Sequence, residues 1–190
     1  SVTTIGNYSF NKSAVVNVTI SKNVASVGQY AFMECESLEK VTFLGADTTI
    51  DRYAFYQSGI KEVVLPSNLS VINDALFGFC RNLNNVEIPV SVTQVNSSAF
   101  ASCSSLDTLY YKGSSEAFGN ITVESNNGKF QKATVVYSIG KTDSDKVYWK
   151  VSDDGALTIF GSGYMTDFDM LNVPWGKDIT SVEIQEGVAS

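Results

Sequence analysis

Phenylalanine marks a repeating hydrophobic pattern along the first half of the chain. The aligned positions follow one another after 22 or 23 residues and are Phe10, Phe32, Phe55, Phe77 and Phe100. Five residues before each of them stands a β-branched residue, which favours extended backbone with an inward side chain; these residues are Ile5, Val27, Ile50, Ile72 and Val95. A period of this length is typical of a solenoid, in which each coil buries its apolar face only by stacking on its neighbours.

A short alternating segment follows each phenylalanine by eight or nine residues. The segments are 18–20, 41–43, 63–65, 86–88 and 109–111, and the first and third residue of each is apolar. This alternation predicts a β-strand whose middle residue points outward. Stacked in parallel, the strands would form a narrow sheet with about 4.8 Å between coils. Pro66 and Pro89 follow two strands and have no N–H to donate, so the ladder should end there.

Residues suited to a corner stand four positions before each phenylalanine. They are Gly6, Gly28, Asp51, Asn73 and Asn96, types that tolerate a positive φ or begin a short helical turn. Small alanines directly precede three of the phenylalanines and would let adjacent coils approach closely. Each coil is therefore predicted to run through a strand, a turn, a second extended piece, a corner and a short helical turn.

The periodicity ends after Tyr111. Two short apolar segments, 120–123 and 133–137, enclose a turn-rich stretch that predicts a hairpin-like connection. This region is placed to cover the last apolar face of the array. Residues 140–146 form a polar linker in this interpretation. Beyond it, an alternating pattern around a "DDG" turn predicts a β-hairpin, and 182–184 repeats the strand pattern of the array.

These columns resemble the BspA-like leucine-rich repeat family, whose units run as Leu, Ile-x-Ile-Pro, Val-x-x-Ile-Gly, Ala-Phe and Cys. The resemblance covers residues 2–112 and implies a repeat solenoid, mostly β with short helical turns. It assigns five leucine-rich repeats of 22–23 residues to 1–112 and a β-rich C-terminal cap to 113–139. It also makes 147–190 a β-hairpin segment that opens a second, truncated array of a larger surface protein.

Two positions depart from the pattern of the family. Asp47 occupies an apolar column, which predicts a local distortion of the third coil. Ala75 and Leu76 stand where the family usually has Tyr-Ala, with no expected effect on the fold class.

Charge and composition narrow the possible functions. The net charge of −7 disfavours nucleic acid as a partner, because a protein that binds it must neutralise phosphates. No stretch of about 18 apolar residues could cross a bilayer, so membrane insertion is not expected. The chain has no histidine, no phosphate-binding loop, no dinucleotide fingerprint and no zinc-ligand spacing. We therefore expect no enzyme activity, no cofactor and no metal.

Paired carboxylates are the one arrangement that keeps glycoside hydrolysis open, since that chemistry needs two acids at a suitable separation. The tight pairs are Asp153 with Asp154 and Asp167 with Asp169. Both lie in glycine-rich turns, where aspartate commonly bonds the local backbone. Turn formation is the preferred interpretation, and weak Ca²⁺ binding is an alternative.

The three cysteines share one column, three residues after a phenylalanine. Cys35, Cys80 and Cys103 alternate there with Ser13 and Ser58. We interpret the column as a ladder of small buried side chains, with metal or redox chemistry as the alternative. Cys80 and Cys103 lie on adjacent coils, within reach of a disulfide, but reduced thiols are expected.

A partner would bind most readily to the outward residues of the strands, which a solenoid displays at a regular spacing. The predicted partner-binding residues on this sheet face are Thr19, Lys40, Thr42, Glu62, Val64, Glu87 and Tyr110. An inert, solvated face is the alternative. A second row, at Met33, Tyr56 and Phe79, could serve self-association or could simply cover the neighbouring coil.

The family resemblance implies a non-catalytic adhesion module that is extracellular or on the cell surface. Its partner would be an extracellular or host-surface protein, with a glycan as a further possibility. Two other functions stay open: a passive structural spacer in a larger surface protein, and a carbohydrate-binding module.

Overall fold

The computed structural model describes residues 2–137, 139–141, 147–152, 154–161, 163–164, 178–185 and 188–189. The chain forms two compact units. The first comprises Ser1–Leu109 and Asn120–Thr134, and the second comprises Tyr110–Gly119 and Val135–Ser190.

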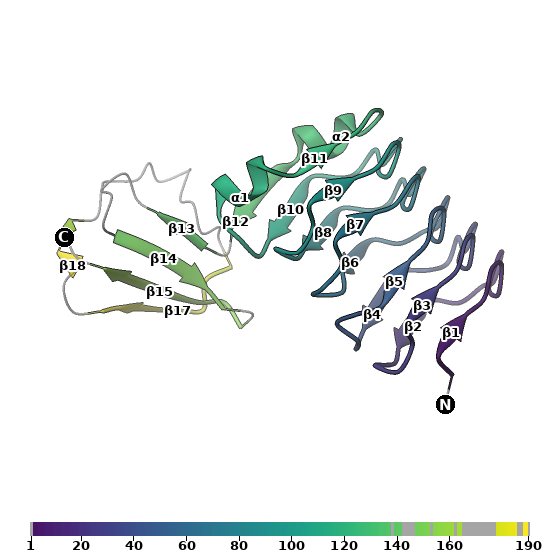
Figure 1. The fold of residues 1–190 in the computed structure, drawn as a ribbon, viewed down its shortest axis with the longest axis horizontal. Coiled ribbons are helices and arrows are strands. Elements are labelled where there is room, and N and C mark those ends of the chain that lie inside the picture. Colours follow the sequence, from purple (N-terminus) through teal and green to yellow (C-terminus); the bar gives the residue numbers. More distant parts are fainter. Residues whose placement is uncertain are drawn as a thin grey trace. The chain divides into compact units, whose positions relative to one another are not determined.

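A ladder of strands, one from each coil, forms the main sheet (Figure 1). Its order is β12-β10-β8-β6-β4-β2, and its members are β2 (Asn17–Ile20), β4 (Lys40–Phe43), β6 (Glu62–Val64), β8 (Asn85–Ile88), β10 (Thr108–Tyr111) and β12 (Thr134–Tyr137). The pairs β2–β4, β4–β6 and β6–β8 are parallel. The predicted parallel strands are confirmed, and β6 and β8 end before Pro66 and Pro89 as expected.

A second strand of two residues follows the main-sheet strand position in each coil, and these short strands form two three-stranded sheets, β1-β3-β5 and β11-β9-β7. The strands are β1 (Thr4–Ile5), β3 (Ser26–Val27), β5 (Thr49–Ile50), β7 (Val71–Ile72), β9 (Gln94–Val95) and β11 (Thr122–Val123). The pairs are again parallel. Val27, Ile50, Ile72 and Val95 are at most 1% exposed, which confirms the inward β-branched column.

The repeated phenylalanines stack on one another through the array. Successive ring centroids, from Phe10 through Phe32, Phe55 and Phe77 to Phe100, lie 5.1, 5.3, 5.7 and 5.4 Å apart, with the rings nearly parallel. The four inner rings are at most 1% exposed, whereas Phe10 is 44% exposed. The stack therefore forms a continuous core.

Each corner contains a run of consecutive turns at the place where a short helical turn was predicted. Residues two before and two after each phenylalanine have positive φ, between 47° and 62°, and none of them is glycine. In the first coil, the N–H groups of Tyr8, Phe10 and Lys12 donate to carbonyls of the next coil. The intervening N–H groups, such as that of Asn11, donate within their own coil. Every second N–H of the corner thus ties it to the neighbouring coil.

Of the two alternatives for the corner column, the structure supports the start of a turn, since Gly6 and Gly28 do not have positive φ. The carbonyls of Gly6, Gly28 and Asp51 accept a hydrogen bond from the residue three positions on, which starts the turn.

The third coil is distorted at Asp47, as predicted. Asp47 turns outward, where its carboxylate accepts a hydrogen bond from Asn68 Nδ2 at 2.7 Å. Thr48 takes the buried place, 2% exposed, and its hydroxyl donates to the Val24 carbonyl at 2.8 Å. A hydroxyl in an apolar column is tolerated because it has this partner.

The segment after β10 continues the coil and then closes it. β11 pairs with β9, and α2 (Gly128–Lys132) places Phe130 on Phe100 with ring centroids 5.1 Å apart. The hairpin predicted between 120–123 and 133–137 is wrong, because β11 and β12 belong to different sheets. The parallel ladder prevails because residues 122–126 retain the extended and corner positions of a further coil.

The second unit contains α1 (Ser115–Gly119), where the aromatic rings of Tyr111, Phe118 and Tyr137 meet edge to face. It also contains a sheet of order β13-β14-β15-β17, formed by β13 (Ile139–Lys141), β14 (Val147–Val151), β15 (Ala156–Gly161) and β17 (Ser181–Ile184). β16 (Gly163–Tyr164) pairs in parallel with β18 (Val188–Ala189). Trp149, Leu157 and Ile159 form a small core.

The predicted hairpin is confirmed by the antiparallel pairing of β14 with β15. The predicted linker begins too early: Gly140 and Lys141 belong to β13, which pairs with β14. The rest of the predicted linker, 142–146, lies outside the described residues.

Candidate partner-binding face

Parallel register brings the outward residues of β2, β4, β6 and β8 into rows. One row runs from Asn17 through Lys40 and Glu62 to Asn85. In the second row, Thr19 lies opposite Thr42 and Val64 lies opposite Glu87. The candidate residues of the first unit are therefore brought together on one face, from four different coils.

Exposure divides these residues into two groups. Thr19, Lys40, Glu62 and Val64 are exposed, and Thr42 and Glu87 are half-buried. Val64 is the apolar member and is 50% exposed. An exposed apolar side chain between polar rows can be desolvated by a partner at little cost, because it has no hydrogen bonds to lose.

Two ion pairs cross between the second and third coils. Lys40 Nζ lies 2.6 Å from Glu62 Oε1, and Lys61 Nζ lies 2.5 Å from Glu39 Oε1. All four side chains are about half exposed, so each pair contributes at most about 1 kcal/mol to stability. Their main effect is to fix the direction of the charged groups. Positive and negative side chains therefore alternate both along each coil and from one coil to the next.

Tyr110 lies in β10 and belongs to the second unit, whereas the face built from β2 to β8 belongs to the first. Its side chain is half-buried. Burial raises the pKa of Tyr110, and the nearby charge of Asp178 raises it further.

The row proposed for self-association is partly packed against the coils. Met33 and Tyr56 are half-buried, and Phe79 is 37% exposed. The Tyr56 ring lies over Gly78, where an added Cβ would come within 2.9 Å of it, and meets Phe79 edge to face at 5.5 Å. These contacts favour the interpretation that the row covers the neighbouring coil.

Sequence reasoning missed a row of stacked tyrosines at the corners. Tyr8, Tyr30 and Tyr53 stand two residues before their phenylalanines, with ring centroids 4.8 and 5.0 Å apart. All three have positive φ, an uncommon conformation for a bulky residue. The recurrence of tyrosine at this spacing was the available signal.

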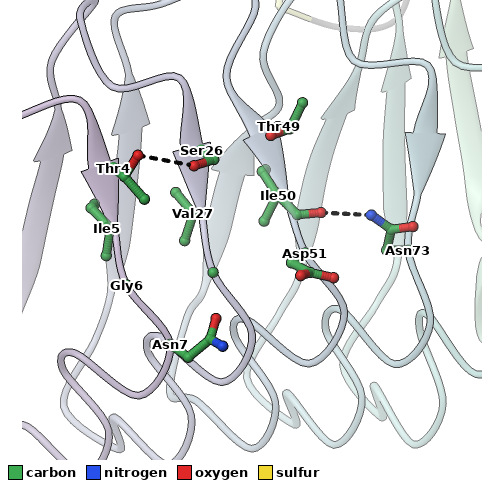
Figure 2. Close-up of a pocket in the computed structure, with 11 residues that line it drawn as sticks. Thr4, Ile5, Gly6, Asn7, Ser26, Val27, Thr49, Ile50, Asp51 and Asn73 are labelled. Atoms are coloured by element: carbon green, nitrogen blue, oxygen red, sulfur yellow. Dashed lines mark hydrogen bonds between the residues drawn. The ribbon is translucent and has the colours of Figure 1, made fainter.

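A shallow pocket lies beside β1, β3 and β5 (Figure 2). Its volume is about 310 Å³, and its polar lining includes Thr4, Ser26, Thr49, Asn7, Asp51 and Asn73. Gly6 and Gly28 line the pocket at two coils where Asp51 and Asn73 stand at the next two, and Asn7 takes the space that a side chain on Gly28 would need. Asn73 Nδ2 donates to the Ile50 carbonyl at 2.7 Å, and Asn7 Oδ1 accepts from the Gln29 N–H at 2.9 Å. Both amides are thus partly used in holding the coils together.

The cysteine column is the buried ladder that the sequence predicts. Each thiol donates to a backbone carbonyl of the preceding coil: Cys35 to Phe10, Cys80 to Phe55 and Cys103 to Phe77, at 2.9, 2.9 and 3.0 Å. All three are free and buried. Burial raises the pKa of all three thiols, that of Cys80 to about 12. Such thiols are poor nucleophiles and poor metal ligands, since both roles need the thiolate.

Of the four paired carboxylates, Asp154 is the one that the structure describes. Asp153, Asp167 and Asp169 lie outside the described residues. Asp154 accepts hydrogen bonds from the Ser152 hydroxyl at 2.5 Å and the Ala156 N–H at 3.4 Å. These bonds lower its pKa, as a turn-forming aspartate requires. Within the described ranges, no group of three or more cysteine or acidic side chains could hold a metal ion.

The stacked parallel coils, with one strand and one phenylalanine corner each, define the class of leucine-rich repeat solenoids. The model of the BspA-type leucine-rich repeat region matches residues 3–128 in six copies. The chain therefore belongs to the BspA-type leucine-rich repeat family. The six copies exceed the five counted from the phenylalanine spacing, in agreement with the further coil at β11.

A solved structure of a leucine-rich repeat protein shares this fold. A leucine-rich repeat protein of T. pallidum is 25% identical, with a TM-score of 0.53 over 66% of this chain and 63% of that one. A leucine-rich cell surface protein from Faecalibacterium prausnitzii is 19% identical, with a TM-score of 0.48 over 98% of this chain and 60% of that one. The chain thus spans about three fifths of the length of these two proteins. No curated protein matches the chain.

None of the helices in the described parts of the chain is both long enough and apolar enough to cross a membrane.

Proposed function

We propose that the first unit is a non-catalytic module that binds an extracellular or host-surface protein at the cell surface. The observation that carries the proposal is the register of β2, β4, β6 and β8, which aligns side chains from four coils on one face. Membership of the BspA-type family supports the surface location.

The chemistry of the face suits a protein partner. Val64 offers an exposed apolar anchor that a partner can desolvate, and the Lys40–Glu62 pair beside it offers a donor and an acceptor held in place. Interfaces commonly combine such an apolar centre with a polar surround. The net charge of −7 favours a partner with a basic contact surface.

Binding to immobilised extracellular-matrix proteins, host surface proteins and glycans tests the proposal. The chain should bind a protein, and Val64→Arg should weaken that binding about tenfold or more, because a charge then enters the contact. Val90→Arg is the matched control, because Val90 is also exposed, at 59%, but follows Pro89 outside the strand rows. The control should bind as the native chain does.

A second variant tests the charges without removing the ion pair. Lys40→Glu with Glu62→Lys exchanges the two groups, so the fold should keep its stability while the row presents the reverse pattern to the partner. Weaker binding by this double variant supports the assignment of this face as the binding site.

A partner that binds all variants equally places the contact elsewhere, and Tyr110→Ala is then the next variant to test. Binding to glycans alone would favour the carbohydrate-binding alternative. Absence of binding to any member of the set would favour the alternative of a passive structural spacer.

A further inference from the structure

The short strands of the array are interrupted at one step, between the third and the fourth coil. β5 belongs to the sheet β1-β3-β5, and β7 belongs to the sheet β11-β9-β7. At the preceding step, the backbone N–H of Asp51 donates to the Val27 carbonyl at 2.9 Å. At the interrupted step, the Ile50 carbonyl accepts instead from the side chain of Asn73, at 2.7 Å (Figure 2). A side-chain amide therefore takes the role of a backbone group at this place.

The polar pocket beside β1, β3 and β5 extends to this interruption, and Asn73 is its lining residue from the fourth coil. Its hydroxyl groups lie in register, with Ser26 opposite both Thr4 and Thr49. Ser26, Thr49 and Asn73 belong to the second, third and fourth coils, and each of these coils has a neighbour on both sides. The site thus lies within the array.

The acceptor groups of the pocket are held in place by the protein. One carboxylate oxygen of Asp51 accepts from the Arg52 N–H at 2.7 Å, which fixes the direction of the exposed carboxylate. Because Asn73 Nδ2 donates to the Ile50 carbonyl, its Oδ1 is left to accept. The Thr49 hydroxyl donates to the preceding coil at 3.2 Å and keeps its lone pairs. Acceptors fixed in advance lose little entropy when a ligand binds.

Donor groups lie beside these acceptors. The hydroxyl of Ser26 makes a long contact of 3.4 Å with Thr4 Oγ1, so it can turn toward a ligand at little cost. Asn7 Oδ1 accepts from the Gln29 N–H at 2.9 Å, which leaves its Nδ2 to donate. The pocket therefore presents donors and acceptors side by side.

The charge of the pocket argues against ionic ligands. Among the described residues that line it, Asp51 is the one charged group, and none is aromatic. An anion would be repelled by Asp51 and by the net charge of −7. A divalent cation would find a single carboxylate, whereas Ca²⁺ sites in proteins usually supply several.

The same lining argues against a nucleobase and against a peptide strand. A nucleobase would find no ring on which to stack. A peptide that adds a strand needs open backbone groups at a sheet edge, but Asn73 already occupies the Ile50 carbonyl at the edge of β5. A ligand rich in hydroxyl groups remains, because each hydroxyl both donates and accepts and so suits the mixture of groups.

We propose that this pocket binds a neutral saccharide, whose hydroxyl groups bond to Asp51, Asn73, Ser26 and Thr49. The pocket volume of about 310 Å³ is at the lower end of the range of small-molecule sites, so it takes a single sugar unit or the end of a longer chain. The site is built from β1, β3 and β5, whereas the partner-binding face is built from β2, β4, β6 and β8. This saccharide site therefore does not depend on the proposed binding of a protein.

NMR titration of the 190-residue chain with tetrasaccharides of glucose, mannose, galactose and N-acetylglucosamine tests the proposal. At least one of them should shift the amide signals of Ser26, Thr49, Asp51 and Asn73. The dissociation constant should be about 1 mM, because a small ligand in a shallow pocket makes few contacts.

Two substitutions in the pocket and one matched control locate the site. Asp51→Ala should raise the dissociation constant about tenfold, since a hydrogen bond to a charged group is lost. Thr49→Val keeps the branched shape, removes the hydroxyl and should raise the constant about threefold. Thr93→Val is the control: Thr93 is also exposed, and its hydroxyl also donates to a carbonyl of the preceding coil, at 3.3 Å, but it lies two coils further along. The control should bind as the native chain does.

Unchanged thermal unfolding of the three variants shows that loss of binding is not loss of fold. A native chain whose amide signals respond to none of the four sugars overturns the proposal. Equal binding by the native chain, Asp51→Ala and Thr49→Val also overturns it, as does sugar binding that requires added Ca²⁺. Val64→Arg, which targets the protein-binding face, should leave sugar binding unchanged, so the two proposals fail or stand separately.

Discussion

The side-chain oxygen of Asn127 accepts a hydrogen bond from the backbone N–H of Phe100 at 2.9 Å. In the preceding coil, the equivalent N–H of Phe77 donates to the carbonyl of Ala99 at 2.8 Å. Asn127 thus replaces a backbone acceptor where the regular coils end. Its Nδ2 donates to the carbonyls of Asn96 and Glu124, at 2.9 and 3.1 Å, and the residue is only 1% exposed.

Replacement of Asn127 should therefore destabilise the array. Asn127→Leu keeps the size of the side chain but leaves the buried Phe100 N–H without a partner and removes one hydrogen bond from each of the Asn96 and Glu124 carbonyls, a loss of about 2–4 kcal/mol in the free energy of unfolding. Urea unfolding followed by circular dichroism measures it. Asn23→Leu, at an exposed position, should change stability by less than about 0.5 kcal/mol. Equal effects of the two substitutions would show that Asn127 does not cap the array.

The phenylalanine stack should lose stability in proportion to burial. Phe55→Ala removes a ring that is fully buried between Phe32 and Phe77, and should cost about 3–5 kcal/mol. Phe10→Ala removes the end ring, 44% exposed and stacked on one side. It should cost less than half as much, since fewer contacts are lost. Denaturant unfolding of both variants checks the difference, and similar losses would contradict a stack that is open at Phe10.

The recurrent elements of this fold could be predicted from the sequence, and the elements that occur once could not. Five aligned phenylalanines and alternating strands are statistical signals that repetition strengthens. Asn127 is needed at one position only, where its side-chain oxygen takes the place of a backbone carbonyl, and the repeat pattern does not indicate it. The hairpin prediction at 120–137 failed for a related reason: the local turn residues are compatible with a hairpin, but β11 pairs with β9 and Phe130 stacks on Phe100.

The candidate face could be predicted in part. The alternation of Val18, Thr19 and Ile20 indicates which residue points outward, but only the register shows that Lys40 meets Glu62. The sequence left open whether the column at Gly6 has positive φ or begins a turn, because glycine adopts positive φ most easily. The chain instead places it at residues such as Tyr8, where the hydrogen bonds to the next coil compensate for the strain.

The buried thiols should make stability fall at alkaline pH. Burial raises the pKa of Cys80 to about 12, whereas an unfolded thiol titrates near pH 8.5. Between these values the unfolded chain releases a proton that the folded chain retains, so the unfolded state gains about 1.4 kcal/mol per pH unit for each such thiol. Below about pH 8 the stabilising difference is fully present.

Unfolding free energies measured across the alkaline range, for the native chain and for Cys80→Ala, check this dependence. The variant should be less stable at neutral pH, because a small cavity forms, but its stability should fall less steeply as pH rises. In the native chain, a thiol reagent should react only as fast as the array opens. Rapid labelling of Cys80 or Cys103 without denaturant would contradict their burial.

The left-handed corner residues should be sites where glycine stabilises the protein. Ser102 is exposed and has a φ of 57°, which costs an L-residue about 1 kcal/mol. Ser102→Gly removes this cost and should raise the unfolding free energy by roughly 0.5 kcal/mol, the remainder being lost to the greater entropy of unfolded glycine. Ser105, also exposed, has no positive φ, so Ser105→Gly should lower stability. Thermal and urea unfolding of the pair give the sign directly, and destabilisation by both would show that the corner at Ser102 is not strained.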